Sequence, residues 1–198
     1  MHTKSQKAKT SFIKFKVIHF INNALICLLL TTAISVSAQT QEKFIDKIDK
    51  LLDLNEKYRN KPDTIEIIGK SILNIAKENN FERGYINGYH SIGFSLYRHG
   101  NNEKAIKYYD SAINIEKSDL EKYYEFLALT LRNRGISNDI LGNHDNATND
   151  FRQLLNLARE REDLKNQGQA HNHLGITAKN QRKWKAAIAS YQTALSIW

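Results

Sequence analysis

Residues 91–112 read SIGFSLYRHGNNEKAIKYYDSA, a stretch with the pattern of helix in which a glycine stands at position 93. Glycine inside a helix costs about 1 kcal/mol relative to alanine, because it loses the most backbone freedom when it is ordered. A contact that only a residue without a side chain permits would offset this cost. Such a glycine should recur wherever the same contact is repeated along the chain.

The same spacing of small and aromatic residues does recur, in three copies. In each copy an alanine follows the glycine by twelve residues, an aromatic residue follows four later, and an alanine or leucine three later again. The copies are Gly93, Ala105, Tyr109 and Ala112; Gly135, Ala147, Phe151 and Leu154; and Gly175, Ala187, Tyr191 and Ala194. The steps between them are 42 and 40 residues.

This spacing describes two helices that pack closely. Residues at i, i+4 and i+7 lie on one stripe of a helix, so the alanine, the aromatic residue and the final small residue share a face. The glycine belongs to the preceding helix, where its missing side chain lets the two backbones approach and leaves room for the aromatic ring. The close contact therefore explains why glycine is needed.

A second glycine marks the end of the first helix of a pair. Gly100 and Gly142 each follow the repeat glycine by seven residues, and a left-handed glycine just past a helix end is a common terminator. The third copy has Arg182 at this place. In that copy Asn180 is the candidate for the left-handed conformation.

The pattern resembles the tetratricopeptide repeat family. Residues 173–194, HLGITAKNQRKWKAAIASYQTA, match its motif best, and residues 91–112 match nearly as well. The middle copy departs, with Arg134 and Asn138 where the family has leucine and an aromatic residue. The steps also exceed the usual 34 residues of the family.

The resemblance implies an all-α fold, a right-handed α-solenoid of antiparallel helix pairs. Apolar residues at helical spacing predict a degenerate first pair ahead of the three clear copies. The predicted organisation is a signal peptide over residues 1–38, a first helix pair over 42–80, and repeats over 83–117, 120–160 and 163–198.

Residues 1–38 have the three parts of a secretory signal: a lysine-rich start, the apolar run ALICLLLTTAI at residues 24–34, and the small-residue exit SVSA before Gln39. The apolar run is shorter than the roughly 20 residues of a membrane span. We expect an exported protein, periplasmic or secreted, with an uncleaved membrane anchor as the alternative. Cleavage after Ala38 would also remove Cys27, the single cysteine.

Charge and motifs exclude several functional classes. Five of the 29 lysines and arginines, and none of the 21 acidic residues, precede Ala38, so the remainder carries a net charge of only about +3. A nucleic-acid partner is therefore not expected. The sequence lacks the phosphate-loop, zinc-protease and serine-elbow motifs, so we predict no enzyme, cofactor or metal. His171 and His173 stand two residues apart and cannot share one ion, which suggests solvated helix faces; His90, His99 and His144 are interpreted as surface or turn residues.

A helix-pair array exposes its first helices on a concave face that binds peptides. By the resemblance, groove positions lie three residues before each repeat glycine and one and four residues after it, and in the first two copies also six residues before it. They are Asn87, His90, Phe94, Tyr97, Leu129, Arg132, Ile136, Asp139, Asn172, Ile176 and Lys179.

Phe94, Ile136 and Ile176 would form an apolar floor of this groove; the alternative is that the two isoleucines pack against neighbouring helices. His90 and Phe94 stand where the chaperone-binding members of the family carry lysine and asparagine, so that specificity is not expected.

Two functions remain open. The first is an exported, non-enzymatic scaffold that binds a protein or peptide and touches the membrane only through an uncleaved signal segment. The second is the extracytoplasmic sensor region of a longer membrane-bound regulator, because the apolar end ALSIW at residues 194–198 lacks the polar capping helix of such arrays. Self-association through that last helix is the related expectation.

Overall fold

The computed structural model describes residues 42–198, and the predicted signal segment lies outside them. Residues 42–57 form a helix, and no residue of the described range lies in a β-strand. The following helices are α2 (Pro62–Asn79), α3 (Glu82–Arg98), α4 (Asn102–Glu116), α5 (Leu120–Ile140), α6 (His144–Glu160), α7 (Leu164–Asn180) and α8 (Trp184–Ile197). Within residues 42–198, no helix is at once long and apolar enough to span a membrane.

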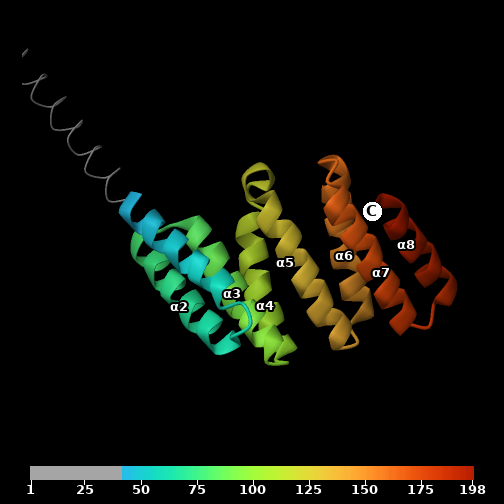
Figure 1. Ribbon diagram of the computed structural model, residues 1–198, viewed down its shortest axis with the longest axis horizontal. Coiled ribbons are helices and arrows are strands. Elements are labelled where there is room, and N and C mark those ends of the chain that lie inside the picture. Colours follow the sequence, from blue (N-terminus) through green and yellow to red (C-terminus); the bar gives the residue numbers. More distant parts are fainter. Residues whose placement is uncertain (1–41) are drawn as a thin grey trace, which may run out of the picture. The chain divides into compact units, whose positions relative to one another are not determined.

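Residues Ile48–Trp198 form one compact unit, in which consecutive helices pack side by side. Each helix from α2 to α7 contacts the next one along the chain, and α5 also contacts α3 and α7 (Figure 1). The first helices of successive pairs are therefore neighbours. The predicted all-α solenoid of antiparallel helix pairs is confirmed.

The repeat glycines lie where the helices of each pair touch. A Cβ atom placed on Gly93 would lie 2.7 Å from Cε1 of Tyr109, and one on Gly135 would lie 2.6 Å from Cε1 of Phe151. Gly175 stands in the same relation to Tyr191, again at 2.7 Å. These distances are shorter than a van der Waals contact, so the predicted reason for the glycines is confirmed.

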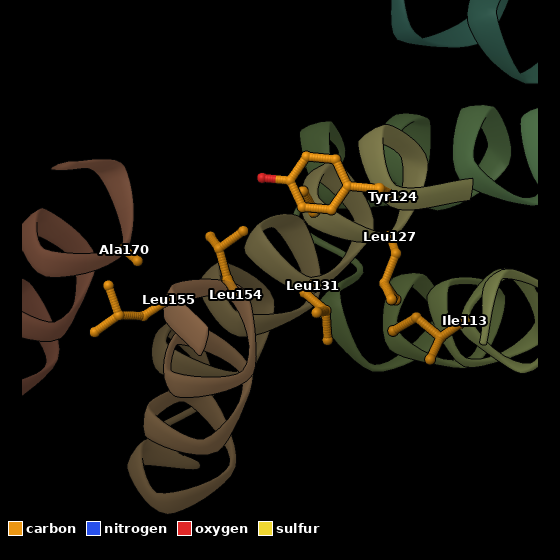
Figure 2. Packing of buried hydrophobic residues seen from close by; sticks show 8 residues of the cluster. Ile113, Tyr124, Leu127, Leu131, Leu154, Leu155 and Ala170 are labelled. Carbon is orange, nitrogen blue, oxygen red and sulfur yellow. The ribbon is translucent and has the colours of Figure 1, made fainter. Parts of the chain in front are cut away.

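The core between the pairs is built from apolar side chains of adjacent helices. Ile113 of α4 packs with Tyr124, Leu127 and Leu131 of α5, and Leu154 of α6 belongs to the same buried cluster (Figure 2). Leu155 and Ala170 extend it toward α7. Burial of such side chains contributes about 1.5–3 kcal/mol each for the larger ones, which holds successive pairs together.

Left-handed residues end the first helix of each of the three clear pairs. Gly100 and Gly142 have φ angles of 76° and 78°, as predicted. In the third pair the prediction of Asn180 is wrong, because Arg182 itself has φ 59°. The Lys183 amide then donates to the Ala178 carbonyl at 2.8 Å, so the turn keeps its form without glycine.

Candidate binding groove

The candidate site is a cavity of about 350 Å³ between the helix of residues 42–57, its following turn, and helices α3 and α5, with one residue from α2. Five predicted groove residues line it: Asn87, His90, Phe94, Leu129 and Arg132. The structure adds seven residues that sequence reasoning missed: Leu52, Asn55, Glu56, Arg59, Ile65, Ser91 and Asn133. The cavity thus combines apolar side chains with amides and two arginines.

The amide side chains of the cavity come from three different helices. Asn55 donates from Nδ2 to Ser91 Oγ at 2.6 Å, and its Oδ1 is buried without a hydrogen-bond partner. Asn87 is 8% exposed and donates from Nδ2 to the Arg83 carbonyl at 2.8 Å. An unsatisfied amide oxygen costs free energy unless a ligand or water supplies a donor. This part of the cavity is therefore suited to accept a hydrogen bond.

His90 is partly buried in the cavity wall, so the interpretation of this residue as a surface or turn position is wrong. Its Nε2 accepts a hydrogen bond from Asn133 Nδ2 at 3.0 Å, and its ring lies 5.8 Å from that of Tyr109. Burial, and then the positive charge of Arg132, lower the pKa of His90 to about 4. The imidazole is neutral near pH 7 and acts as a fixed acceptor.

Arg132 is the central cation of the cavity. It donates from Nη1 to Gln169 Oε1 of α7, a neutral partner. Burial, and then the charge of Arg59, lower its pKa, which is the direction expected for a guanidinium that lacks a compensating negative charge. Of the residues that the structure describes, no carboxylate forms an ion pair with Arg132.

The remaining predicted groove residues lie outside the residues that line this cavity. Tyr97 packs beside Phe94 with ring centroids 6.2 Å apart. Ile136 and Ile176 are partly buried, whereas Asn172 and Lys179 are exposed.

Asp139 has its carboxylate occupied by contacts within the protein. Its Oδ1 lies 2.8 Å from His144 Nδ1, and its Oδ2 accepts from Asn180 Nδ2 at 2.7 Å. These bonds tie the end of α5 to the start of α6 and the end of α7. The Asp139 carboxylate therefore stabilises contacts between helices, independently of any ligand in the groove.

The expectation of a solvated His173 is wrong. Its ring is partly buried and stacks on Phe151 with centroids 5.0 Å apart and an interplanar angle of 14°. Burial is the main cause that lowers the pKa of His173 to about 4. Among residues 42–198, no group of three or more histidine, cysteine, aspartate or glutamate side chains is arranged to hold a metal ion.

A local signal exists for two of the missed polar residues, Ser91 and Asn133, each of which stands two positions before a repeat glycine. Asn133 directly follows Arg132 on α5, so a wider definition of the groove face would have included it. Asn55 and Arg59 belong to the degenerate first pair, which lacks the repeat glycine from which groove positions are counted. Their place in the cavity comes from how that segment packs on α3.

Comparison with known proteins identifies the repeat. Residues 85–160 match the family model for the tetratricopeptide repeat. No curated protein sequence matches the chain. A solved structure titled "Crystal structure of MamA" is similar, with 16% sequence identity and a TM-score of 0.49, and the match covers 80% of this chain and 91% of that chain.

The matched residues contain two of the three glycine–aromatic contacts, Gly93 with Tyr109 and Gly135 with Phe151. The third contact, Gly175 with Tyr191, extends the same arrangement to α7 and α8 beyond the matched range. Residues 85–160 therefore belong to the tetratricopeptide repeat family, and α7 and α8 continue the same packing.

Proposed function

We propose that the chain is an exported, non-enzymatic scaffold that binds an extended segment of another protein in the groove of α3, α5 and α7. The observation that carries the proposal is the cavity on the first helices of the pairs, where Phe94 and Leu129 stand beside amides and Arg132. Apolar pockets with a few fixed polar groups are typical of binding sites for side chains and small ligands.

The chemistry of the cavity favours binding over catalysis. A general base works best when its pKa lies near the operating pH. The pKa of His90 is lowered to about 4, and its Nε2 already accepts from Asn133. These groups are better suited to hold a ligand in one orientation than to move a proton.

Export rests on the sequence of the leader, with its lysine-rich start, its apolar run at residues 24–34 and its small-residue exit. Expression of the full chain in a bacterial host, followed by fractionation and mass determination, tests this step. A mature protein that begins at Gln39 in the periplasm or medium is expected. A full-length chain confined to the cytoplasm would contradict export.

Groove binding is tested by selecting peptides from a random phage-displayed library on the purified full chain. The Phe94→Asp variant places a charge in the apolar part of the cavity and should lose the selected peptides. Lys107→Asp changes the charge of an exposed residue of α4 and is the matched control. If a folded Phe94→Asp variant selects the same peptides as the wild type, the groove is not the binding site.

A second candidate function is that the array forms the input region of a longer membrane-bound regulator. The exposed side of α8 favours it: Leu195 is 75% exposed, whereas its repeat equivalents Leu155 and Ile113 are 6% and 2% exposed because the next helix covers them. A further helix would cover Leu195 in the same way. The mass of the native gene product tests this function. A mass that includes a membrane span and an output domain would support the input region of a regulator.

The same exposed side of α8 would take a second copy of the chain in the self-associated alternative. A molar mass that doubles with concentration in light scattering, and returns to the monomer value in Leu195→Glu, would support that alternative.

A further inference from the structure

We propose that Arg132 binds the side-chain carboxylate of an aspartate or glutamate in the bound peptide, so that the groove selects acidic segments. The inference rests on the proposed function and specifies the chemistry of its ligand. It follows from the contacts of Arg132, from the charges around it and from the amides on either side.

The contacts of Arg132 contrast with those of Arg134 on the same helix. Arg134 forms ion pairs with Asp110 and Asp150, at 2.6 and 2.5 Å. Arg132, also partly buried, has the neutral amide of Gln169 as its hydrogen-bond partner. A guanidinium withdrawn from water is normally paired, because its lost hydration must be replaced by an opposite charge. Arg132 is therefore a preformed anion-binding group.

The surroundings of Arg132 add to the positive field. Arg59, from the turn after residues 42–57, lines the same cavity, and its charge helps to lower the pKa of Arg132. Its own partner is Glu56, an exposed residue at 3.7 Å across one helical turn, a contact that solvent weakens. The charge of Arg132 also lowers the pKa of His90 and of His173, so its field extends along the groove. A ligand carboxylate would relieve the repulsion between the charges of Arg132 and Arg59.

The position of the amides favours an internal side chain over a chain terminus. Asn55, Asn87 and Asn133 come from three helices around Arg132, and carboxamides can donate to and accept from a passing peptide backbone. In an extended peptide, alternate side chains point to the same side. A ligand with an acidic residue two positions from an apolar one could therefore place the acid on Arg132 and the apolar group against Phe94 and Leu129.

The test uses fluorescent peptides with blocked termini and the purified full chain, with binding measured by anisotropy. The first peptide carries Glu-Ala-Leu at its centre, and the second carries Gln-Ala-Leu. The wild type should bind the first about tenfold more tightly, the difference typical of one charge-assisted bidentate contact. Arg132→Gln should remove the preference, and Arg132→Lys should keep part of it.

Arg152→Gln removes an exposed arginine of α6 and controls for the change in net charge; it should leave the preference unchanged. A third peptide with Gln-Ala-Leu and a free terminal carboxylate separates the two sources of the anion. Tighter binding of this third peptide than of the first would overturn the proposal. The comparison of peptides on the wild type holds even if Arg132→Gln fails to fold.

The failure of this inference differs from the failure of the proposed function. Equal binding of the Glu and Gln peptides, both weakened by Phe94→Asp, would disprove acid selection while leaving groove binding intact. Equally, if the Glu peptide does not bind although library-selected peptides bind in a Phe94-dependent manner, acid selection is wrong. Library peptides that ignore Phe94→Asp would instead remove the proposed function itself.

Discussion

Arg134 donates from Nη2 and Nε to the two carboxylate oxygens of Asp150, at 2.5 and 3.1 Å. The Asp150 side chain is 2% exposed, and Asn138 donates to it from the same helix as Arg134, at 3.3 Å. Arg134 and Asn138 are the two residues at which the middle repeat departs from the family motif. A buried polar network thus occupies the two positions at which the first and third copies carry apolar residues, Ile92 with Leu96 and Leu174 with Ala178.

Replacement of Arg134 alone should be strongly destabilising. The equivalent residues of the first clear copy are Ile92, Leu96 and Tyr108, in place of Arg134, Asn138 and Asp150. We expect Arg134→Ile to lower the free energy of unfolding by about 3 kcal/mol, because it leaves the Asp150 carboxylate buried without its cation. Urea denaturation followed by circular dichroism measures this loss.

The matched variant Arg134→Ile, Asn138→Leu, Asp150→Tyr carries the whole apolar set of the first copy. It should recover part of the stability that the single variant loses, because this set, which the first copy already accommodates, leaves no buried charge without its partner. A single variant as stable as the wild type would show that the ion pair contributes nothing to this repeat.

The repeat glycine is tested by Gly93→Ala. Alanine favours the helix by about 1 kcal/mol, but its Cβ would lie 2.7 Å from Cε1 of the fully buried Tyr109 ring. We expect a net loss of about 2 kcal/mol, since overpacking a rigid contact outweighs the propensity gain. Thermal unfolding of a double-mutant cycle with Tyr109→Leu checks the cause. If alanine costs as much beside leucine as beside tyrosine, the ring is not what requires glycine.

Arg182 offers a stabilising substitution. Its φ of 59° is a left-handed conformation that the two earlier copies give to glycine. Arg182→Gly should raise the free energy of unfolding by roughly 0.5–1 kcal/mol, because glycine adopts this backbone without a Cβ penalty. The reciprocal Gly142→Arg should lower it by a similar amount. Unchanged melting temperatures in both variants would mean that this turn bears no strain.

Glu116 makes the stability depend on pH. Its side chain is buried, Oε1 accepts from Thr130 Oγ1 at 2.8 Å, and Oε2 has no hydrogen-bond partner. Burial raises its pKa to about 7, against the smaller opposing effects of Thr130 and Arg134. The folded state therefore holds the proton more tightly than the unfolded chain, and stability falls as the pH rises from about 4.5 to about 7, by on the order of 3 kcal/mol.

Glu116→Gln should abolish this fall, because glutamine stays neutral. Denaturation at about pH 4.5 and about pH 8 should show similar stabilities at the lower pH and a more stable variant at the higher one. The pKa values of His90 and His173 are lowered to about 4. Their protonation therefore lowers the stability of the protein as the pH falls below about 6.5, a dependence opposite to that of Glu116. They are common to both proteins, so the difference between variant and wild type isolates Glu116. A constant difference at both pH values would contradict the buried carboxylate.

The sequence predicted the contacts that follow from the period of a helix. The spacing from glycine to alanine to aromatic residue recurs because each helix pair repeats one local geometry, and the structure places all three rings on their glycines. The resemblance to the tetratricopeptide repeat family, counted from the repeat glycines, located Asn87, His90, Phe94, Leu129 and Arg132, which line one cavity. Positions counted from a motif can be predicted when the motif itself fixes the face of the helix.

Tertiary structure alone decided the contacts between pairs. His90 meets Asn133 across 43 positions, Arg132 meets Gln169 across 37, and Asn55 meets Ser91 across 36. Such pairings depend on how one helix pair is offset and rotated against the next, a small angle that no local periodicity records. For the same reason, it became visible only once the helices were stacked that Arg134 forms two ion pairs, whereas Arg132 forms none with a carboxylate of residues 42–198.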